Sequence, residues 1–151
     1  MKEEIRIKDN WANREIREDE LLNENTLKLI QEIHGQIVKV EKHFKVGGME
    51  VDAIIHCRKS RTKRVGVELK ESDINKALEQ AIKRRNYFNY FYIILGSDRR
   101  LIGYDIRSLR FKLDDFFRNS IGIITIHNSE AFLIYPSYHK SVGLENVRNF
   151  K

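Results

Sequence analysis

Two acidic residues and a lysine lie on stretches of this sequence that are predicted to be neighbouring strands. Asp52 lies within residues 49–57, and Glu68 and Lys70 lie near the end of residues 65–70. Apolar, mostly β-branched residues alternate with polar ones in both stretches, which is typical of strands. Successive side chains of a strand point to opposite faces, so Glu68 and Lys70 share one face. If the two stretches pair as a hairpin, Asp52 can lie beside Glu68 and Lys70.

Two carboxylates and a lysine on an otherwise apolar sheet are costly to bury without a charged partner. A divalent cation between the carboxylates is the usual reason for such an arrangement. Oxygen-only ligands suit Mg²⁺ or Mn²⁺, and these are the cofactors that we expect. A structural alternative stays open, in which Lys70 forms simple ion pairs with Asp52 and Glu68.

The surrounding pattern alternates between helix and strand and predicts an α/β fold. Leu22, Leu29, Ile30 and Ile33 recur at helical spacing, and Gly35 follows as a natural helix end. A capping signal at Ser72 or Asp73 predicts a second helix to about Asn89. The expected elements in chain order are a helix over 13–34, strands over 36–44, 49–57 and 65–70, a helix over 74–89, a strand over 90–96, a short helix over 109–117 and a strand hairpin over 121–135.

Asp52 followed by Glu68-Leu69-Lys70 resembles the signature of the PD-(D/E)XK nuclease superfamily, and the spacing is similar to that of archaeal Holliday-junction resolvases. Val51 stands where the motif has proline. The resemblance implies a restriction-endonuclease-like core over about residues 20–96, in which helices flank a central mixed β-sheet in the order αβββαβ. It also implies a C-terminal strand hairpin after that core.

The same resemblance implies an Mg²⁺-dependent deoxyribonuclease and the residues of its site. It singles out Glu24 as a third acidic group over Glu20 or Glu32, and Glu50 competes with Glu24 for that place. It also places Gln80 near the catalytic lysine and the phosphate. The implied catalytic residues are Asp52, Glu68, Lys70, Glu24 and Gln80, and the implied metal ligands are Asp52, Glu68, the carbonyl of Leu69, and Glu24.

Charge favours an anionic partner. The chain has 151 residues, which suit a single domain. Its formal net charge of +6 and pI of about 9.4 favour nucleic acid or an acidic membrane surface as a partner, and the family resemblance implies DNA. The predicted turn between the Asp52 and Glu68 strands is strongly basic; its alternative role is a solvated turn that deters edge pairing. The expected DNA-binding residues are Arg58, Lys59, Arg61, Lys63, Arg64, Lys83 and Arg84.

Other features narrow the class of protein. Cys57 is the only cysteine, which excludes an internal disulfide and a cysteine-based zinc or iron–sulfur site. No apolar run reaches the ~20 residues of a membrane span, and the first residues do not form a signal peptide, so we expect a cytoplasmic protein without a membrane partner. Residues 1–19 and 137–151 are expected to be a peripheral arm and tail of the single domain 1–151.

The substrate stays open at this level. Duplex and branched DNA both fit, no base-reading motif stands out, and structure- or end-dependent cleavage is favoured over sequence-specific cleavage. A homodimer is compatible with the sequence but not required by it. The alternative function is a nucleic-acid-binding or assembly subunit that keeps the nuclease fold without cutting.

Overall fold

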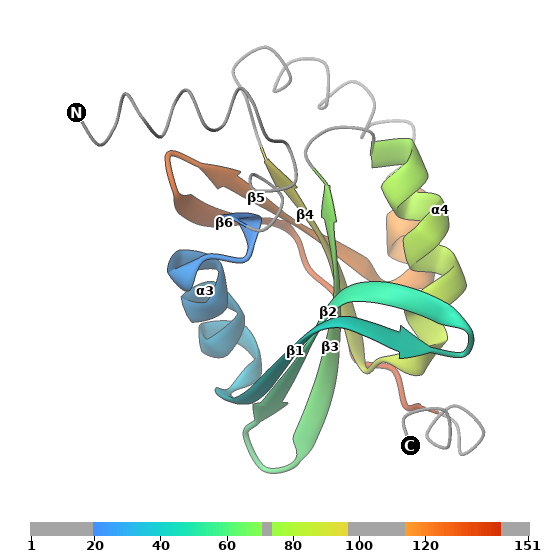
Figure 1. Ribbon diagram of the computed structural model, residues 1–151, viewed down its shortest axis with the longest axis horizontal. Coiled ribbons are helices and arrows are strands. Elements are labelled where there is room, and N and C mark those ends of the chain that lie inside the picture. Colours follow the sequence, from blue (N-terminus) through green and yellow to red (C-terminus); the bar gives the residue numbers. More distant parts are fainter. Residues whose placement is uncertain (1–19, 71–73, 97–113, 143–151) are drawn as a thin grey trace.

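Six strands form one mixed sheet in the computed structural model, which describes residues 20–70, 74–96 and 114–142 (Figure 1). The elements in chain order are α3 (Glu24–His34), β1 (Gln36–Val46), β2 (Met49–Arg58), β3 (Thr62–Lys70), α4 (Ile74–Arg84), a 3-10 turn (Arg85–Tyr87), β4 (Tyr90–Gly96), β5 (Ile121–His127) and β6 (Glu130–Tyr135). Residues 114–119 are also helical. The predicted arm 1–19, the start of the predicted helix 109–117 and the end of the tail lie outside the described residues.

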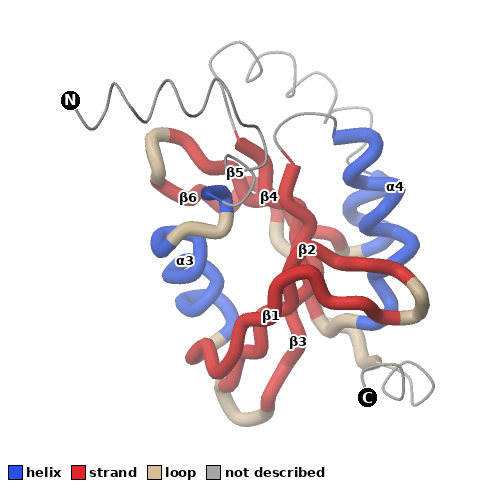
Figure 2. The backbone as a smooth tube through the Cα atoms, viewed as in Figure 1, coloured by secondary structure: helices blue, strands red, loops and turns tan. Residues whose placement is uncertain are grey.

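The strand order in the sheet is β1-β2-β3-β4-β5-β6. β1, β2 and β3 pair antiparallel, β3, β4 and β5 pair parallel, and β6 returns antiparallel to β5. Figure 2 colours these strands red and the helices beside them blue. α4 connects the parallel strands β3 and β4. The expected succession of helix, three strands, helix and strand is therefore present, as are the mixed sheet and the closing hairpin.

The two helices cover opposite faces of the sheet, with α3 on one side and α4 on the other (Figure 1). Because the side chains of each strand alternate, the sheet contributes to two apolar cores. The α3 side includes Leu21, Leu22, Ile30, Ala53, Ile55, Val65, Val67, Tyr92 and Ile94. The α4 side includes Ile54, Ala77, Leu78, Ala81, Phe88, Phe91, Ile93, Phe116 and Ile121.

Small residues let α4 and its neighbours approach the sheet. Ala77 and Ala81 are fully buried, as the helical pattern predicts. Gly66 lies on the same face of β3, where an added Cβ would come within 2.6 Å of the Phe91 ring. A side chain at Gly66 would therefore push Phe91 out of the core. The neighbouring Val65 and Val67 belong to the core on the other face of the sheet, where branched side chains fit.

The start and end of α3 follow local chemistry. Asn23 caps the helix, since its side chain accepts a hydrogen bond from the Thr26 N–H at 2.9 Å. Gly35 ends it with a φ of 105°, and its N–H donates to the carbonyl of Gln31. The predicted closing glycine is confirmed. α3 itself begins at Glu24, and residues 20–21 are also helical. The predicted start near residue 13 lies outside the described residues.

The second helix ends earlier than predicted because of a buried arginine. α4 ends at Arg84, and Arg85, which is only 1% exposed, begins the 3-10 turn. The Arg85 guanidinium donates to five main-chain carbonyls from three parts of the chain, those of Phe88, Asn89, Asn119, Ser120 and Tyr138.

The segment after β6 is fixed to the domain over Ser137–Lys140. Ser137 is buried and accepts a hydrogen bond from the Phe91 N–H at 3.0 Å. The Lys140 N–H donates to the carbonyl of Asn89 at 2.9 Å. The part of the predicted peripheral tail that the structure describes is therefore docked on β4. No helix within the described residues is long and apolar enough to cross a membrane.

Candidate metal and phosphodiester site

The register of the β2–β3 hairpin brings Asp52 next to Glu68. Ala53 pairs with Val67, so residues 52 and 68 come next in the antiparallel ladder. One Asp52 carboxylate oxygen, Oδ2, accepts a hydrogen bond from the Leu69 N–H at 2.7 Å. The Glu68 carboxyl group lies within hydrogen-bonding reach of Asp52. The two acidic residues predicted to act together therefore do meet, on the face of the sheet that α4 covers.

Burial makes this carboxylate pair electrostatically unusual. Glu68 is only 3% exposed. Its burial, and next the negative charge of Asp52, raise the pKa of Glu68 from 4.5 to about 8, while the charges of Arg84 and Lys70 act in the opposite direction. Near neutral pH the metal-free Glu68 carboxyl group therefore carries a proton. A bound cation would replace that proton and neutralise the buried carboxylate in its place.

Lys70 lies two residues after Glu68 at the end of β3 and is half-buried. Strand alternation puts it on the same face as Glu68, as predicted. Its positive charge is close enough to lower the pKa of Glu68. The Asp52, Glu68 and Lys70 arrangement inferred from the sequence is thus assembled by two adjacent strands.

α4 adds Gln80 and Arg84 along one edge. The guanidinium of Arg84 donates to the carbonyl of Glu50 at 2.7 Å and to the carbonyl of Gln80 at 2.9 Å. Its Nε also lies 3.5 Å from Glu68 Oε1, an ion pair without hydrogen-bond geometry. Arg84 therefore lies beside the carboxylate pair, and its predicted contact with DNA stays a prediction.

Two buried oxygen atoms on this side of the sheet have no hydrogen-bond partner within the part of the chain that the structure describes. They are Glu68 Oε1 and Gln80 Oε1. Buried polar atoms are normally paired, so such atoms commonly indicate a missing ion or water. Gln80 lies one helical turn before Arg84, which is consistent with the predicted position of Gln80 near the site.

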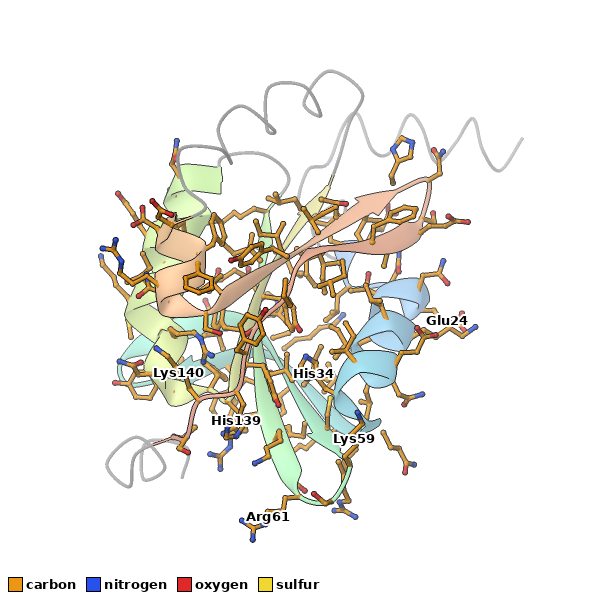
Figure 3. The ribbon with its side chains drawn as sticks, turned by 180° about the vertical axis from the view of Figure 1, so that it is seen from behind. Glu24, His34, Lys59, Arg61, His139 and Lys140 are labelled. Atoms are coloured by element: carbon orange, nitrogen blue, oxygen red, sulfur yellow. The ribbon has the colours of Figure 1, made fainter. Side chains whose placement is uncertain are left out.

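Glu24 is not brought to the carboxylate pair. It lies in the first turn of α3, is exposed, and points away from the sheet in Figure 3. Because α3 and α4 cover opposite faces, Glu24 and Glu68 belong to different sides of the sheet. The alternatives Glu20 and Glu32 are also exposed.

Glu50 is the remaining predicted alternative. Its carboxylate is exposed and lies 3.9 Å from His43, while its carbonyl accepts the hydrogen bond from Arg84. Within residues 20–70, 74–96 and 114–142, no group of three or more His, Cys, Asp or Glu side chains could hold a metal ion. The arrangement therefore offers two carboxylates and neutral oxygens instead of three acidic ligands.

The predicted DNA-binding residues divide between several places. Five of them surround the β2–β3 turn at the end of the sheet opposite Asp52. Arg58, Lys59 and Arg61 are exposed there, and Lys63 and Arg64 are half-buried. Lys83 is exposed on α4. Burial lowers the pKa of Arg64, whose N–H donates to the Asn89 side chain.

The donor set fits a hard divalent cation. Mg²⁺ usually keeps several waters and needs only one or two protein carboxylates. Asp52 and Glu68 supply these, and the predicted Leu69 carbonyl and the unpaired Gln80 oxygen are of the same chemical type. Sulfur and nitrogen ligands are absent from this set, which disfavours zinc.

Comparisons with known proteins give a likeness in fold only. No family model and no curated protein matches the chain. A structure of SPO1766, a protein of unknown function from Silicibacter pomeroyi, aligns with a TM-score of 0.52 at 10% identity over 83% of this chain and 78% of that one. A structure of SfsA from Pyrococcus furiosus in complex with Ca²⁺ aligns with a TM-score of 0.37 at 16% identity over 74% of this chain and 58% of that one. The first alignment supports a shared α/β fold.

Proposed function

We propose that this chain is a metal-dependent DNA endonuclease with a restriction-endonuclease-like core of the PD-(D/E)XK type. The observation that carries the proposal is the placement of two adjoining carboxylates, one of them buried, with a lysine on the same face of β3. The element order around them supports it, since the Asp strand, the Glu-x-Lys strand and the following helix are neighbours in space.

Asp52, Glu68 and the Leu69 carbonyl would hold Mg²⁺ or Mn²⁺. The bound ion would supply a more acidic water and offset the negative charge that develops on the phosphate. The hydrogen bond from the Leu69 N–H orients Asp52, and the burial of Glu68 excludes competing water from one side of the pair.

Lys70 would orient the attacking water and stabilise the developing charge. It lies close enough to Glu68 for its positive charge to lower the pKa of that carboxyl group. Gln80, whose side-chain oxygen has no described partner, would assist at the phosphate. Glu24 would join this site only after a rearrangement that brings α3 or the substrate toward it.

A second candidate is a nucleic-acid-binding or assembly subunit that keeps the fold without cutting. The observation that favours it is the ion pair between Arg84 and Glu68 at 3.5 Å. An arginine tied to two carbonyls beside Glu68 partly neutralises that carboxylate without a metal. The two proposals differ in whether a divalent cation binds and in whether DNA is cut.

The test is a cleavage assay on linear duplex, single-stranded, flapped and four-way-junction DNA with Mg²⁺, Mn²⁺ or EDTA. We expect cutting that requires the metal, that Glu68→Gln abolishes, and that Lys70→Ala lowers by about 10²-fold or more. The matched control is Glu79→Gln, an exposed carboxylate on α4. No cutting of any substrate with retained DNA binding would favour the non-catalytic subunit, and full activity of Lys70→Ala would refute the role of that residue.

A further inference from the structure

Basic side chains from two distant parts of the sequence gather at the end of the sheet opposite Asp52. Two come from the β2–β3 turn, one comes from the start of β3, and two follow β6. Lys63 Nζ lies 3.2 Å from His139 Nε2 although 76 residues separate them in sequence. We call Lys59, Arg61, Lys63, His139 and Lys140 the distal basic surface; Figure 3 labels four of them.

The fold holds these groups together through hydrogen bonds to main-chain carbonyls and N–H groups. The side chain of Asn89 donates to the carbonyl of Lys140 at 3.0 Å, and the Asn89 carbonyl accepts the Lys140 N–H. The buried Arg85 guanidinium donates to the carbonyl of Tyr138 at 2.9 Å. The segment that carries His139 and Lys140 is therefore fixed beside the turn by β4 and by the residues that follow α4.

No carboxylate balances this charge within the described residues. None of Lys59, Arg61, Lys63 and Lys140 forms an ion pair there. The ammonium group of Lys59 instead donates to a neutral acceptor, the carbonyl of Ile33 at the end of α3, at 3.4 Å. Like charges held close together without counterions favour an anionic ligand.

The chemistry of this surface fits a nucleic-acid backbone better than a membrane. Aromatic rings accompany the cations, since the Tyr90 ring contacts His139 at a centroid distance of 5.6 Å and Tyr138 is 57% exposed. Rings of this kind suit stacking with bases. The turn from Arg58 to Thr62 contains no apolar side chain that could enter a bilayer.

We propose that the distal basic surface binds the phosphodiester backbone of nucleic acid at a place separate from the Asp52–Glu68 pair. That this nucleic acid is DNA rests on the proposed function. Arg58 lies six positions after Asp52 on β2, which corresponds to about 20 Å at ~3.3 Å per residue. This distance equals about six nucleotide steps at ~3.4 Å each. The surface therefore contacts a part of the substrate that lies beyond the cleaved bond.

The test measures binding, without catalysis, of a fluorescent duplex of about 30 base pairs in EDTA between ~50 and ~200 mM salt. The variant is Lys59→Gln/Arg61→Gln/Lys63→Gln. The matched control is Lys28→Gln/Lys42→Gln/Arg118→Gln, which removes three exposed charges elsewhere. Both variants reduce the formal net charge from +6 by three, to +3.

We expect the first variant to lose affinity on the order of 10²-fold at ~0.1 M salt and its salt dependence to flatten by about 2.7 in log–log slope, while the control stays close to wild type. Equal losses in both variants would overturn the proposal, because net charge alone would then explain binding. Circular dichroism confirms that each variant is folded.

A parallel measurement uses vesicles that contain phosphatidylserine. Loss of vesicle binding with unchanged DNA binding would overturn the proposal in favour of a membrane surface. The outcome is also separable from that of the proposed function. If the wild type cuts no DNA but the first variant still loses affinity, the nuclease proposal fails and the distal basic surface stands.

Discussion

Glu68→Gln should stabilise the metal-free protein at alkaline pH even though it removes the central residue of the proposed site. The buried carboxyl group has a pKa of about 8 when folded and an ordinary value of 4.5. Between these values the folded state binds more protons than the unfolded state, so the free energy of unfolding falls as pH rises. A neutral glutamine lacks this dependence, and its amide can donate to Asp52.

The magnitude follows from the same two values. A difference of about 3.5 at ~1.36 kcal/mol per pH unit gives about 5 kcal/mol as the upper value of the cost of ionising Glu68. Because water enters buried sites in solution, we expect about 2–5 kcal/mol of added stability for Glu68→Gln at pH ~9 and about none at pH ~5.

The assay is urea unfolding of wild type, Glu68→Gln and the exposed control Glu79→Gln across this pH range in EDTA. At pH ~8, added Mg²⁺ should stabilise the wild type and leave Glu68→Gln unchanged, because the ion would replace the proton on Glu68. If the stability curves of wild type and Glu68→Gln run parallel from pH ~5 to ~9, the reasoning about this carboxylate pair is refuted.

The remaining predictions concern neighbouring residues. Arg84→Gln removes the cation that lies 3.5 Å from Glu68, so the pKa of Glu68 should rise further. Because the Arg84 guanidinium then no longer repels the metal ion, Mg²⁺ affinity at pH ~9 should increase several-fold in titration calorimetry, and unchanged affinity would contradict this. Arg85→Met leaves five carbonyls without their donor and should cost about 3 kcal/mol or more in urea unfolding; a loss below ~1 kcal/mol would show that water replaces the guanidinium. Tyr92→Phe removes the 2.6 Å hydrogen bond to His34 and should cost about 1–3 kcal/mol; wild-type stability would mean that His34 finds another partner.

The sequence by itself determined the strands, their order along the chain and the Asp52, Glu68 and Lys70 arrangement. The reason is that this information is local. Alternation along β3 places Glu68 and Lys70 on one face, and a short hairpin turn leaves β2 little choice of partner. The predicted face and the predicted neighbour strand were both confirmed. The same locality explains why Ala77 and Ala81 could be assigned to the core.

Only the tertiary structure decided which residues from distant segments join these elements. Glu24 lies on the far side of the sheet because α3 packs against the face opposite α4, and periodicity within a helix does not say which face of a sheet it covers. Arg84 faces the carboxylate pair because α4 crosses β3 at the level of Glu68.

The same limit applies to the buried Arg85 and to the distal basic surface. Both depend on the segment after β6 returning to β4, about 50 residues along the chain from Asn89. A basic residue in a helix and a polar tail look solvated in sequence. Their roles arise from main-chain carbonyls and like charges that only the folded chain brings together, because hydrogen bonds and Coulomb forces depend on distance in space and not on separation in sequence.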